Sequence, residues 1–423
     1  MTAGAVPARP PGAPTRPVGA PDRFAADERW GTRAALLLRP FADRWTAPTP
    51  AERARIAEAL HSGDPVADAL LAAISRGETS MARVHAALDA AVAGEPVPAG
   101  QPTSVQPTSV GEPPELTTFV RAVTELPAWL DPELAARGAR VCLRAGLTGQ
   151  DVLGDLALLG GYRPAATTEV LTSTGRLTGE GTSKRVAETM AWWHAVAAPD
   201  GWRPGSPGWE MTVHVRLMHA RVNRAMLAKG WDTAAKGQPI NQADMAATNG
   251  LFSATFLLGT LVLGIPHTPA DARAVMHLWR WMGWVMGVDE DFLHDRPRRA
   301  LRDMYHFLRT SPPPDHNSVV LAQALLDSYG LTDFPRFAGV RRRLDVARHR
   351  ATATYLNGPA GMRELGQRPA LPWYPAVLIP ANLLAHGAAV VSPQVRGALE
   401  RRGYQRIRRQ ISRYSRGAVE PLA

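Results

Sequence analysis

Cysteine is almost absent from this 423-residue sequence. The single cysteine, Cys142, excludes an intramolecular disulfide and any zinc site built from several thiolates. It lies in the segment GARVCLRAG, where we expect it to be a small buried hydrophobic residue. The chain must therefore be stabilised by a packed core, which a sequence of this length and 45% hydrophobic content can build.

Lysine is nearly as scarce, with only Lys184, Lys229 and Lys236 in the sequence. The formal net charge of +10 therefore comes from arginine. These arginines are dispersed along the chain, except near the C-terminus. Dispersed positive charge does not indicate a nucleic-acid surface, so we predict no nucleic-acid partner.

Export and membrane signals are also missing. Residues 1–23 contain no apolar stretch of the kind that a signal peptide requires. The most apolar run, Leu251 to Ile265, is short for a membrane span. The run from Leu371 to Val391 is interrupted by three prolines. We expect a soluble, cytoplasmic protein.

Several common catalytic motifs are absent. The sequence has no G-x-G-x-x-G after a strand, no phosphate loop and no G-x-S-x-G elbow. A di-iron carboxylate bundle needs two Glu-x-x-His units and two further carboxylates. Only Glu58 to His61 forms such a unit, and Asp291 to His294 is a weaker version. Dinucleotide, phosphate-loop, serine-hydrolase and di-iron chemistry are therefore not supported.

The pattern of apolar residues predicts an all-α fold. Apolar side chains recur at three- and four-residue spacing, and Pro and Gly separate these stretches. No run of alternating apolar and polar residues is long enough for a sheet. We predict five divisions: a disordered tail (1–23), N-terminal helices (24–94), a linker that contains the repeat QPTSV-QPTSV (95–114), a helical core (115–391) and a basic C-terminal segment (392–423).

The most informative stretch is WEMTVHVRLMHARVNRAML, from Trp209 to Leu227. His219 lies at the edge of its apolar arc, near Met218 and Val222, and Arg216 flanks the imidazole on the same side. A neutral imidazole with apolar surroundings is what an axial haem ligand requires. A core histidine with an ordinary hydrogen bond is the alternative, and this helix alone favours it.

A second polar cluster is predicted on the helix RVAETMAWWHAV. Arg185 and Thr189 share one face, with Glu188 beside them. Glu169 on the preceding helix could supply the carboxylate that a buried Arg185 needs. A structural ion pair between packed helices is the alternative, and this pattern by itself favours it. His277, in VMHLWRWMGW, is the rival to His219 as a ligand.

From about Trp129 to Leu293 the chain resembles the latex clearing protein family. These are haem-b rubber oxygenases within a larger group that includes an oxygenase of fungal mycophenolic acid biosynthesis. The resemblance rests on five stretches in matching order: STGRL from Ser173, KRVAETMAWW from Lys184, VRLMHARV from Val215, PINQADMAATNGLFS from Pro239 and WRWMGWVMGVDED from Trp279.

The resemblance implies a globin-like helical core with additional N- and C-terminal helices. It places His219 at the proximal haem ligand, which raises His219 above the core-histidine alternative. It also places Arg185 and Thr189 in the distal pocket and Glu169 at the family's catalytic base. With Arg216, Met218 and Val222 near His219, the resemblance predicts a haem b site that binds O2.

Two departures concern the substrate. Rubber-cleaving members carry a lysine just before the distal threonine, where this chain has Glu188. We expect Glu188 to turn away and pair with an arginine. Those members are also secreted. We therefore predict a haem-dependent oxygenase for a hydrophobic small molecule other than rubber, with the electron donor left open. The alternatives are a haem-binding sensor or carrier without turnover, and a helical scaffold that has lost haem.

The basic segment RGALERRGYQRIRRQISRYSR, from Arg396 to Arg416, allows two interpretations. It could rest on an anionic membrane. Alternatively, a terminal helix packs Ile407, Ile411 and Tyr414 onto the core and leaves its arginines in water. We prefer the second interpretation.

Overall fold

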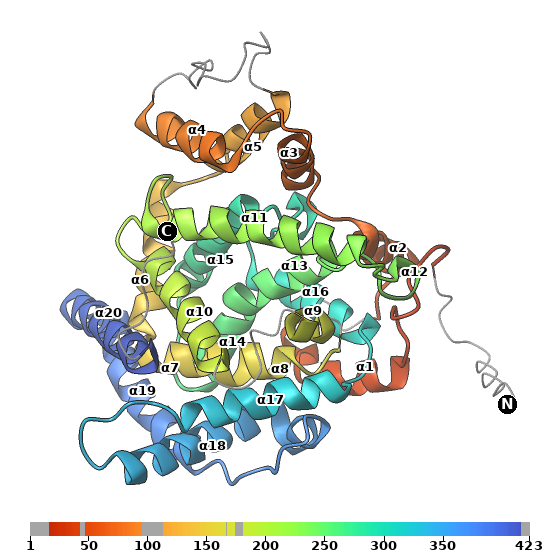
Figure 1. Ribbon diagram of the computed structural model, residues 1–423. Coiled ribbons are helices and arrows are strands. Elements are labelled where there is room, and N and C mark those ends of the chain that lie inside the picture. Colours follow the sequence, from red (N-terminus) through yellow and green to blue (C-terminus); the bar gives the residue numbers. More distant parts are fainter. Residues whose placement is uncertain (1–16, 43–46, 95–112, 166, 174–180, 416–423) are drawn as a thin grey trace, which may run out of the picture.

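The computed structural model describes residues 17–42, 47–94, 113–165, 167–173 and 181–415, and these form helices without a strand (Figure 1). The all-α prediction is confirmed. Most of the predicted tail and the whole QPTSV repeat lie outside the described residues.

The N-terminal helices lie within residues 24–94, where the sequence predicts them. Thr49 and Glu52 form a reciprocal capping box at the start of the second α-helix, and Asp64 and Ser80 cap the two helices that follow. These local signals explain why the boundaries were predictable. The elements are α1 (Glu28–Ala34), the 3₁₀ turns η1 (Ala35–Leu37) and η2 (Arg39–Phe41), α2 (Pro50–His61), α3 (Pro65–Ser75) and α4 (Met81–Ala93).

The central helices include one π-helix, η3, in which the backbone is wider than in an α-helix. The apolar spacing from Asp151 to Gly160 predicts a helix there, and it does not indicate this departure from α geometry. The elements are α5 (Pro114–Thr124), α6 (Pro132–Arg144), α7 (Gly146–Asp151), η3 (Val152–Leu158), α8 (Leu159–Gly161), α9 (Thr168–Ser173), α10 (Gly181–Ala197), α11 (Pro207–Ala228) and α12 (Thr233–Lys236).

A second π-helix, η4, lies within the apolar stretch from Gln242 to Gly264, which the sequence pattern predicts to be one long helix or a pair of helices. The remaining elements are α13 (Gln242–Gly250), η4 (Leu251–Thr255), α14 (Phe256–Val262), α15 (Pro269–Val285), the 3₁₀ turn η5 (Glu290–Phe292), α16 (Pro297–Thr310), α17 (His316–Tyr329), α18 (Ala338–Glu364), α19 (Trp373–Val391) and α20 (Pro393–Ser415).

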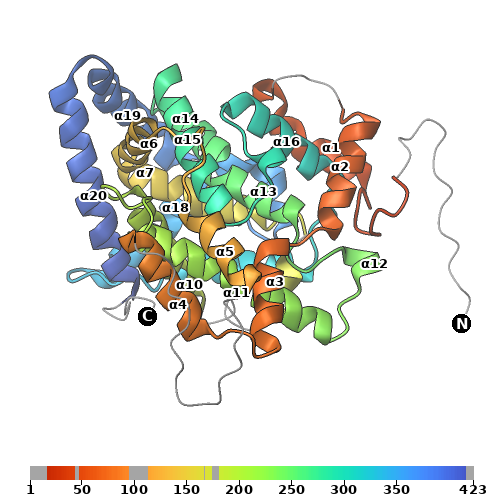
Figure 2. The same cartoon turned by 90° about the horizontal axis from the view of Figure 1, so that it is seen from above.

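The main core lies between α6, α10, α11 and α15 (Figures 1 and 2). Trp193, Trp202 and Trp281 are fully buried in it. Helices α6 and α15 pack with their backbones in contact at Gly138, where a Cβ would collide with the carbonyl oxygen of Ala274. This close contact fixes α15 against α6, and α15 in turn forms one wall of the site described below.

Helix α19 corrects one expectation. The three prolines do not break it, and it runs unbroken from Trp373 to Val391. Pro372 and Pro375 lie at the helix start, where backbone N–H groups have no intrahelical partner, so only Pro380 removes a hydrogen bond. Two helical runs are long and apolar enough to cross a membrane: Gln242–Val262, 56% buried, and Trp373–Val391, only 22% buried.

Candidate functional site: two adjoining cavities

His219 projects from the middle of α11 into a cavity of about 360 Å³, which we call the inner cavity. The ring atom Nδ1 is buried and finds no hydrogen-bond partner among the described residues. Burial lowers the pKa of His219 to about 4; the nearby charge of Asp64 opposes this shift and that of Arg185 adds to it. His219 is therefore a neutral imidazole at pH 7, which is the form that binds metal ions.

The walls of the inner cavity are largely aromatic. Phe252 of η4 stacks on Trp279 of α15 with ring centroids 5.2 Å apart, and Trp192 of α10 contacts both rings edge-on. The Trp192 indole N–H donates to Thr212 Oγ1 at 2.9 Å, which fixes the ring orientation. These helices therefore present a well-packed aromatic surface to the inner cavity.

A few buried polar atoms of the inner cavity lack partners. Neither side-chain atom of Gln150 finds a hydrogen-bond partner within the described part of the chain, and the same holds for Gln410 Oε1. Gln150 lies on α7 and Gln410 on α20. Buried polar groups are nearly always satisfied in folded proteins. The unpartnered Gln150, Gln410 and His219 atoms therefore indicate that the inner cavity binds a molecule with both apolar and polar parts.

The structure brings only part of the predicted distal cluster to the cavity. Thr189 is a lining residue, and its hydroxyl donates to the Arg185 carbonyl at 3.0 Å. Arg185 binds Glu188 at 2.8 Å, which confirms that Glu188 pairs with an arginine. Glu169 is half-exposed and binds Lys236 at 2.7 Å. The predicted Glu169–Arg185 ion pair is therefore wrong, because each residue has a different partner.

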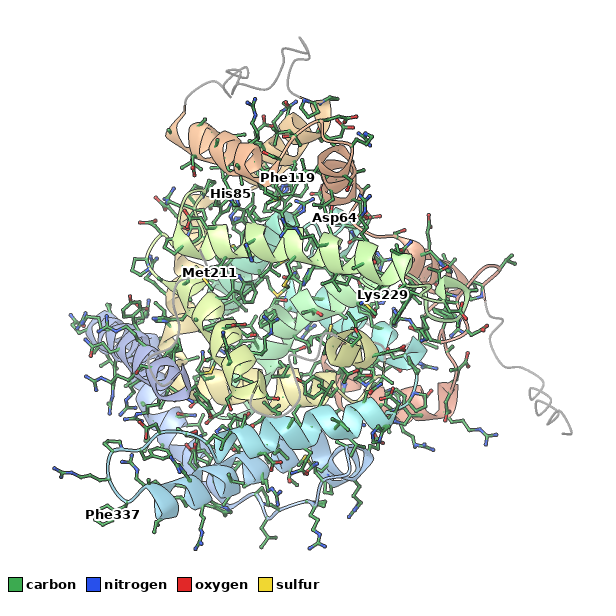
Figure 3. All side chains as sticks on the ribbon, in the orientation of Figure 1. Asp64, His85, Phe119, Met211, Lys229 and Phe337 are labelled. Atoms are coloured by element: carbon green, nitrogen blue, oxygen red, sulfur yellow. The ribbon has the colours of Figure 1, made fainter. Side chains whose placement is uncertain are left out.

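The other predicted cofactor contacts also lie elsewhere. Arg216, Met218 and Val222 are not among the lining residues of the inner cavity. The buried Arg216 guanidinium donates to both carboxylate oxygens of Asp64, at 2.6 and 2.9 Å. Asp64 lies between α11 and the N-terminal helices (Figure 3). The structure thus gives Arg216 a role in joining helices.

His277, the rival ligand, has an ordinary partner. Its Nε2 accepts a hydrogen bond from the Asp131 backbone N–H at 2.8 Å, and its ring packs edge-on against Trp129. It does not line the inner cavity. Of the two candidate histidines, only His219 presents an unpartnered imidazole to a cavity.

Sequence reasoning missed a buried polar network at the cavity wall. The Tyr329 and His349 rings both line the cavity and stack on each other with centroids 3.5 Å apart. Both bind Asp155 of η3, through Tyr329 Oη at 3.1 Å and His349 Nδ1 at 2.9 Å. The only sequence signal was an aspartate in the apolar run VLGDLALL. Its partners are far along the chain, so that signal could not identify them.

This network also contains a group of possible metal ligands, Asp151, Asp155 and His349. Arg348 donates to both carboxylate oxygens of Asp151 at 2.9 Å. Its other terminal nitrogen lies 3.0 Å from His349 Nε2, which must then accept the hydrogen bond. Because these ligand atoms are already occupied, the group acts as a structural network. Asp151 and Arg348 form an ion pair. Hydrogen bonds that Tyr329 and His349 donate to Asp155 hold η3 against α17 and α18, and His349 is neutral because burial lowers its pKa to about 3.

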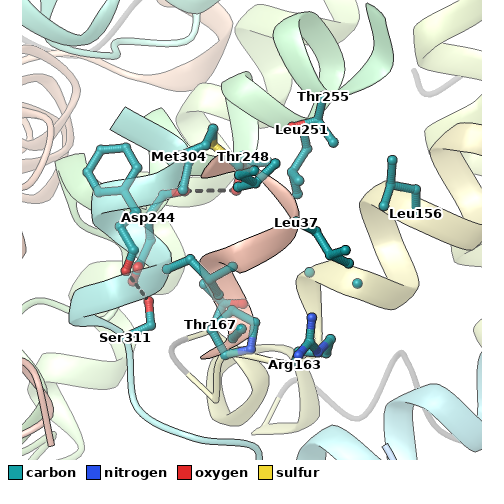
Figure 4. A pocket seen from close by; sticks show the side chains of 18 of the residues that line it. Leu37, Leu156, Arg163, Thr167, Asp244, Thr248, Leu251, Thr255, Met304 and Ser311 are labelled. Atoms are coloured by element: carbon teal, nitrogen blue, oxygen red, sulfur yellow. Dashed lines mark hydrogen bonds between the residues drawn. The ribbon is translucent and has the colours of Figure 1, made fainter. Parts of the chain in front are cut away.

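A second, outer cavity of about 470 Å³ adjoins the inner one (Figure 4). The two cavities share five lining residues, Gly161, Thr167, Asp244, Thr248 and Leu251. The walls of the outer cavity are mostly apolar and include Leu37, Leu156 and Met304. Two of the shared residues pack closely together, because a Cβ added at Gly161 would lie 3.3 Å from the Leu251 side chain.

The charges at the outer cavity are already neutralised. Arg23 binds Asp244 at 2.7 Å, and Arg163 binds Glu364 at 2.9 Å. The Thr255 hydroxyl, in contrast, is buried and has no hydrogen-bond partner among the described residues. The outer cavity is therefore suited to an uncharged apolar molecule with one hydrogen-bonding group.

Comparison with known proteins gives three consistent results. The catalytic-domain family described as "ER-bound oxygenase mpaB/B'/Rubber oxygenase" matches residues 110–391. A rubber oxygenase from Streptomyces sp. (strain K30) is 27% identical over 188 residues, which cover 43% of this chain and 45% of that enzyme. The structure of latex clearing protein in the closed state is similar with a TM-score of 0.54 and 19% identity, covering 91% of this chain and 95% of that chain.

The last of these matches shows the fold alone, because its identity is low. The curated rubber oxygenase is matched over less than half of its own length. The family match is more extensive, since it covers well over half of the 423 residues and includes every residue of both the Arg185 and His219 helices. The chain belongs to the oxygenase family whose catalytic domain is shared by the mpaB and rubber oxygenases.

Proposed function

We propose that this protein is a haem b-dependent oxygenase that uses O2 to oxidise or cleave a hydrophobic small molecule. The observation that carries the proposal is the neutral, unpartnered imidazole of His219 on the wall of an apolar cavity. This function also agrees with the oxygenase family to which the chain belongs.

The residues present fit a haem. The volume of the inner cavity falls in the range of about 300–1,000 Å³ that is usual for ligand and cofactor sites. His219 would hold the iron, and the amides of Gln150 and Gln410 could bind polar groups of the same ligand. When bound, haem would supply the oxygen chemistry, tuned by the residue that holds the iron and by the polarity of the pocket.

The remaining roles belong to side chains of the chain itself. Phe252, Trp192 and Trp279 would exclude water from the reacting centre. Thr189 would present a hydroxyl at the cavity wall. Glu169 would accept a proton from the substrate. Its carboxylate binds Lys236 and lines neither cavity, so this role requires that ion pair to open and the side chain to turn toward the inner cavity.

The proposed substrate is a small molecule and not rubber. Glu188, which replaces the lysine expected of rubber-cleaving members, binds Arg185. A carboxylate held in this way cannot supply the amine that those members use. The outer cavity provides additional apolar volume next to the inner one, in which an elongated small molecule could extend. We place this activity in the cytoplasm and leave the electron donor open.

The test compares His219→Ala with the matched control His277→Ala, both expressed with added haemin. Wild type and His277→Ala should show a Soret band, and His219→Ala should lose it while keeping its circular dichroism spectrum. Loss of the band in His277→Ala alone would contradict the ligand assignment. Failure of the wild type to bind haemin would contradict the proposal itself.

Turnover separates an oxygenase from a haem sensor or carrier. With a chemical reductant, O2 consumption should rise when apolar alkenes are added and should not rise with polyisoprene latex. A wild-type protein that binds haem but consumes no O2 with any reductant or alkene would favour the sensor or carrier.

A further inference from the structure

Helix α19 exposes its apolar side chains to the surroundings. The segment from Leu371 to Val391 contains no charged residue. Within it, Val377, Leu384 and Val391 are 67%, 78% and 82% exposed. A helix at a water-facing surface normally turns charged or polar residues outward. The outward face of α19 is therefore unusual for a surface in contact with water.

The buried face of the same helix combines the small apolar residues Pro375 and Ala389 with two polar residues. Asn382 is buried, and its amide donates to the Leu263 carbonyl at 2.8 Å. His386 is also buried. Burial, together with the smaller effect of the nearby Arg144 charge, lowers the pKa of His386 to about 4. Polar residues thus attach α19 to the protein while apolar residues face outward. This inversion indicates that a non-aqueous partner covers α19.

Helix α20 lies beside α19 at the same edge of the molecule and adds positive charge (Figures 1 and 2). Ile407 and Tyr414 are buried, which confirms that α20 packs on the core. Its exposed arginines form no ion pair with any carboxylate in the described part of the chain; they are Arg401, Arg402, Arg406, Arg408, Arg409 and Arg413.

The crowding of these arginines has an electrostatic effect. Partial burial, with the neighbouring charges of Arg402 and Arg409, lowers the pKa of Arg406. An anionic partner would relieve this repulsion. A second copy of the chain would instead bring two rows of arginines close together, which is unfavourable. The charge on α20 therefore favours an anionic surface over a homodimer.

We propose that α19 and α20 together form a docking surface for an anionic lipid bilayer. Apolar side chains of α19 would enter the acyl–headgroup boundary, and the arginines of α20 would bind lipid phosphates. An apolar face with adjacent basic residues is the combination that holds proteins at the plane of a membrane. The core-packed position of α20 is compatible with this role because its arginines remain exposed.

The position of this surface suggests a purpose, which rests on the proposed function. Asn382 binds the carbonyl of Leu263, which directly follows Val262 of the outer cavity wall. Leu261 and Tyr355, beside the same rim, are exposed. The bilayer-facing edge therefore borders the outer cavity, so a lipophilic substrate could pass from the membrane into it.

The test is flotation of the purified full chain with vesicles of phosphatidylcholine alone or with phosphatidylglycerol added. The wild type should float with the anionic vesicles, and added salt should weaken this binding. The triple variant Val377→Ser/Leu384→Ser/Val391→Ser should bind at least about tenfold more weakly. The triple variant Arg402→Gln/Arg406→Gln/Arg409→Gln should also lose about tenfold or more, because each cation contributes separately.

Matched controls remove exposed residues of the same kinds elsewhere. Leu126→Ser/Leu227→Ser/Leu331→Ser controls for lost apolar surface, and Arg296→Gln/Arg298→Gln/Arg299→Gln controls for lost charge. Both should bind vesicles like the wild type. Circular dichroism and thermal melting establish that every variant is folded.

Three outcomes would overturn the proposal. The first is that the wild type binds neutral and anionic vesicles equally well. The second is that the control variants lose as much binding as the α19 and α20 variants. The third is that the wild type binds no vesicles and sediments as a dimer, which the α19 variant dissociates. The last outcome would identify a second copy as the partner. Vesicle binding requires neither haem nor turnover, so its failure is distinguishable from failure of the proposed oxygenase activity.

Discussion

The Asp64–Arg216 ion pair provides the sharpest test of how the site is held together. Both side chains are buried, and two hydrogen bonds join them. Arg216 also donates to the Val285 carbonyl at 3.2 Å, and Asp64 caps α3 through the Ala67 N–H. The pair therefore connects the N-terminal helices to α11 and to the end of α15.

We predict that Asp64→Ala lowers the free energy of unfolding by about 4–6 kcal/mol. Stranding the buried Arg216 charge should cost about 3–5 kcal/mol, and loss of the helix cap should add about 1 kcal/mol. The double variant Asp64→Ala/Arg216→Met removes both charges and keeps most of the side-chain volume. It should recover most of the loss, because a well-packed apolar pair is often as stable as a buried ion pair.

Urea denaturation followed by far-UV circular dichroism measures these free energies. A loss below about 1 kcal/mol in Asp64→Ala, or a double variant as unstable as the single one, would refute the reasoning. The same variants test the role of Arg216 beside His219. The double variant should keep the Soret band. Its loss in a stable double variant would instead support the sequence-based prediction that Arg216 contacts a cofactor.

Three further predictions concern buried groups. Burial and the charge of Asp64 raise the pKa of Asp68 to about 6. Between about pH 4 and 6 the Asp68 carboxyl of the unfolded chain loses its proton while that of the folded chain keeps it, so stability falls as pH rises. Asp68→Asn should therefore stabilise the protein at pH 7.5 by about 1–2 kcal/mol after solvent screening. In thermal melts at pH 3.5 the same substitution should have no effect. Gly138→Ala should destabilise by at least about 1–3 kcal/mol in urea, since its Cβ would collide with the Ala274 carbonyl, and a neutral result would contradict that contact. Burial raises the pKa of the Cys142 thiol to about 12, so a thiol reagent at pH 8 should react only after unfolding.

The sequence predicted most helices because their signals are local. Capping residues such as Thr49 and Asn241, with prolines at first turns, mark the helix starts. The exposure of α19 was not predictable in this way. An uncharged apolar run with Pro375 and Pro380 is read equally well as a broken loop or as a buried helix. Only the packing shows that its polar residues turn inward.

The site was predicted less completely. His219 was selected because the family motif outweighed the core-histidine alternative, which its helix alone favours. His219 does line the inner cavity, and its role as a haem ligand stays a prediction. The partner of Arg185 was misassigned because Glu188, three residues later on the same helix, can pair with it at little entropic cost. Lys236, which binds Glu169, is 67 positions away along the chain. Sequence spacing carries no information about such a contact.

The two π-helices explain both the shape of the cavities and why the periodicity did not reveal them. A π turn contains an extra residue, so side chains leave the 3.6-residue register on which face predictions depend. In η3, Leu156 faces the outer cavity while Ala157 faces the inner one. In η4, Phe252 lines the inner cavity, Thr255 the outer, and Leu251 both. Because η3 and η4 contact each other, these off-register turns together build the shared wall, and its position could be found only from the three-dimensional structure.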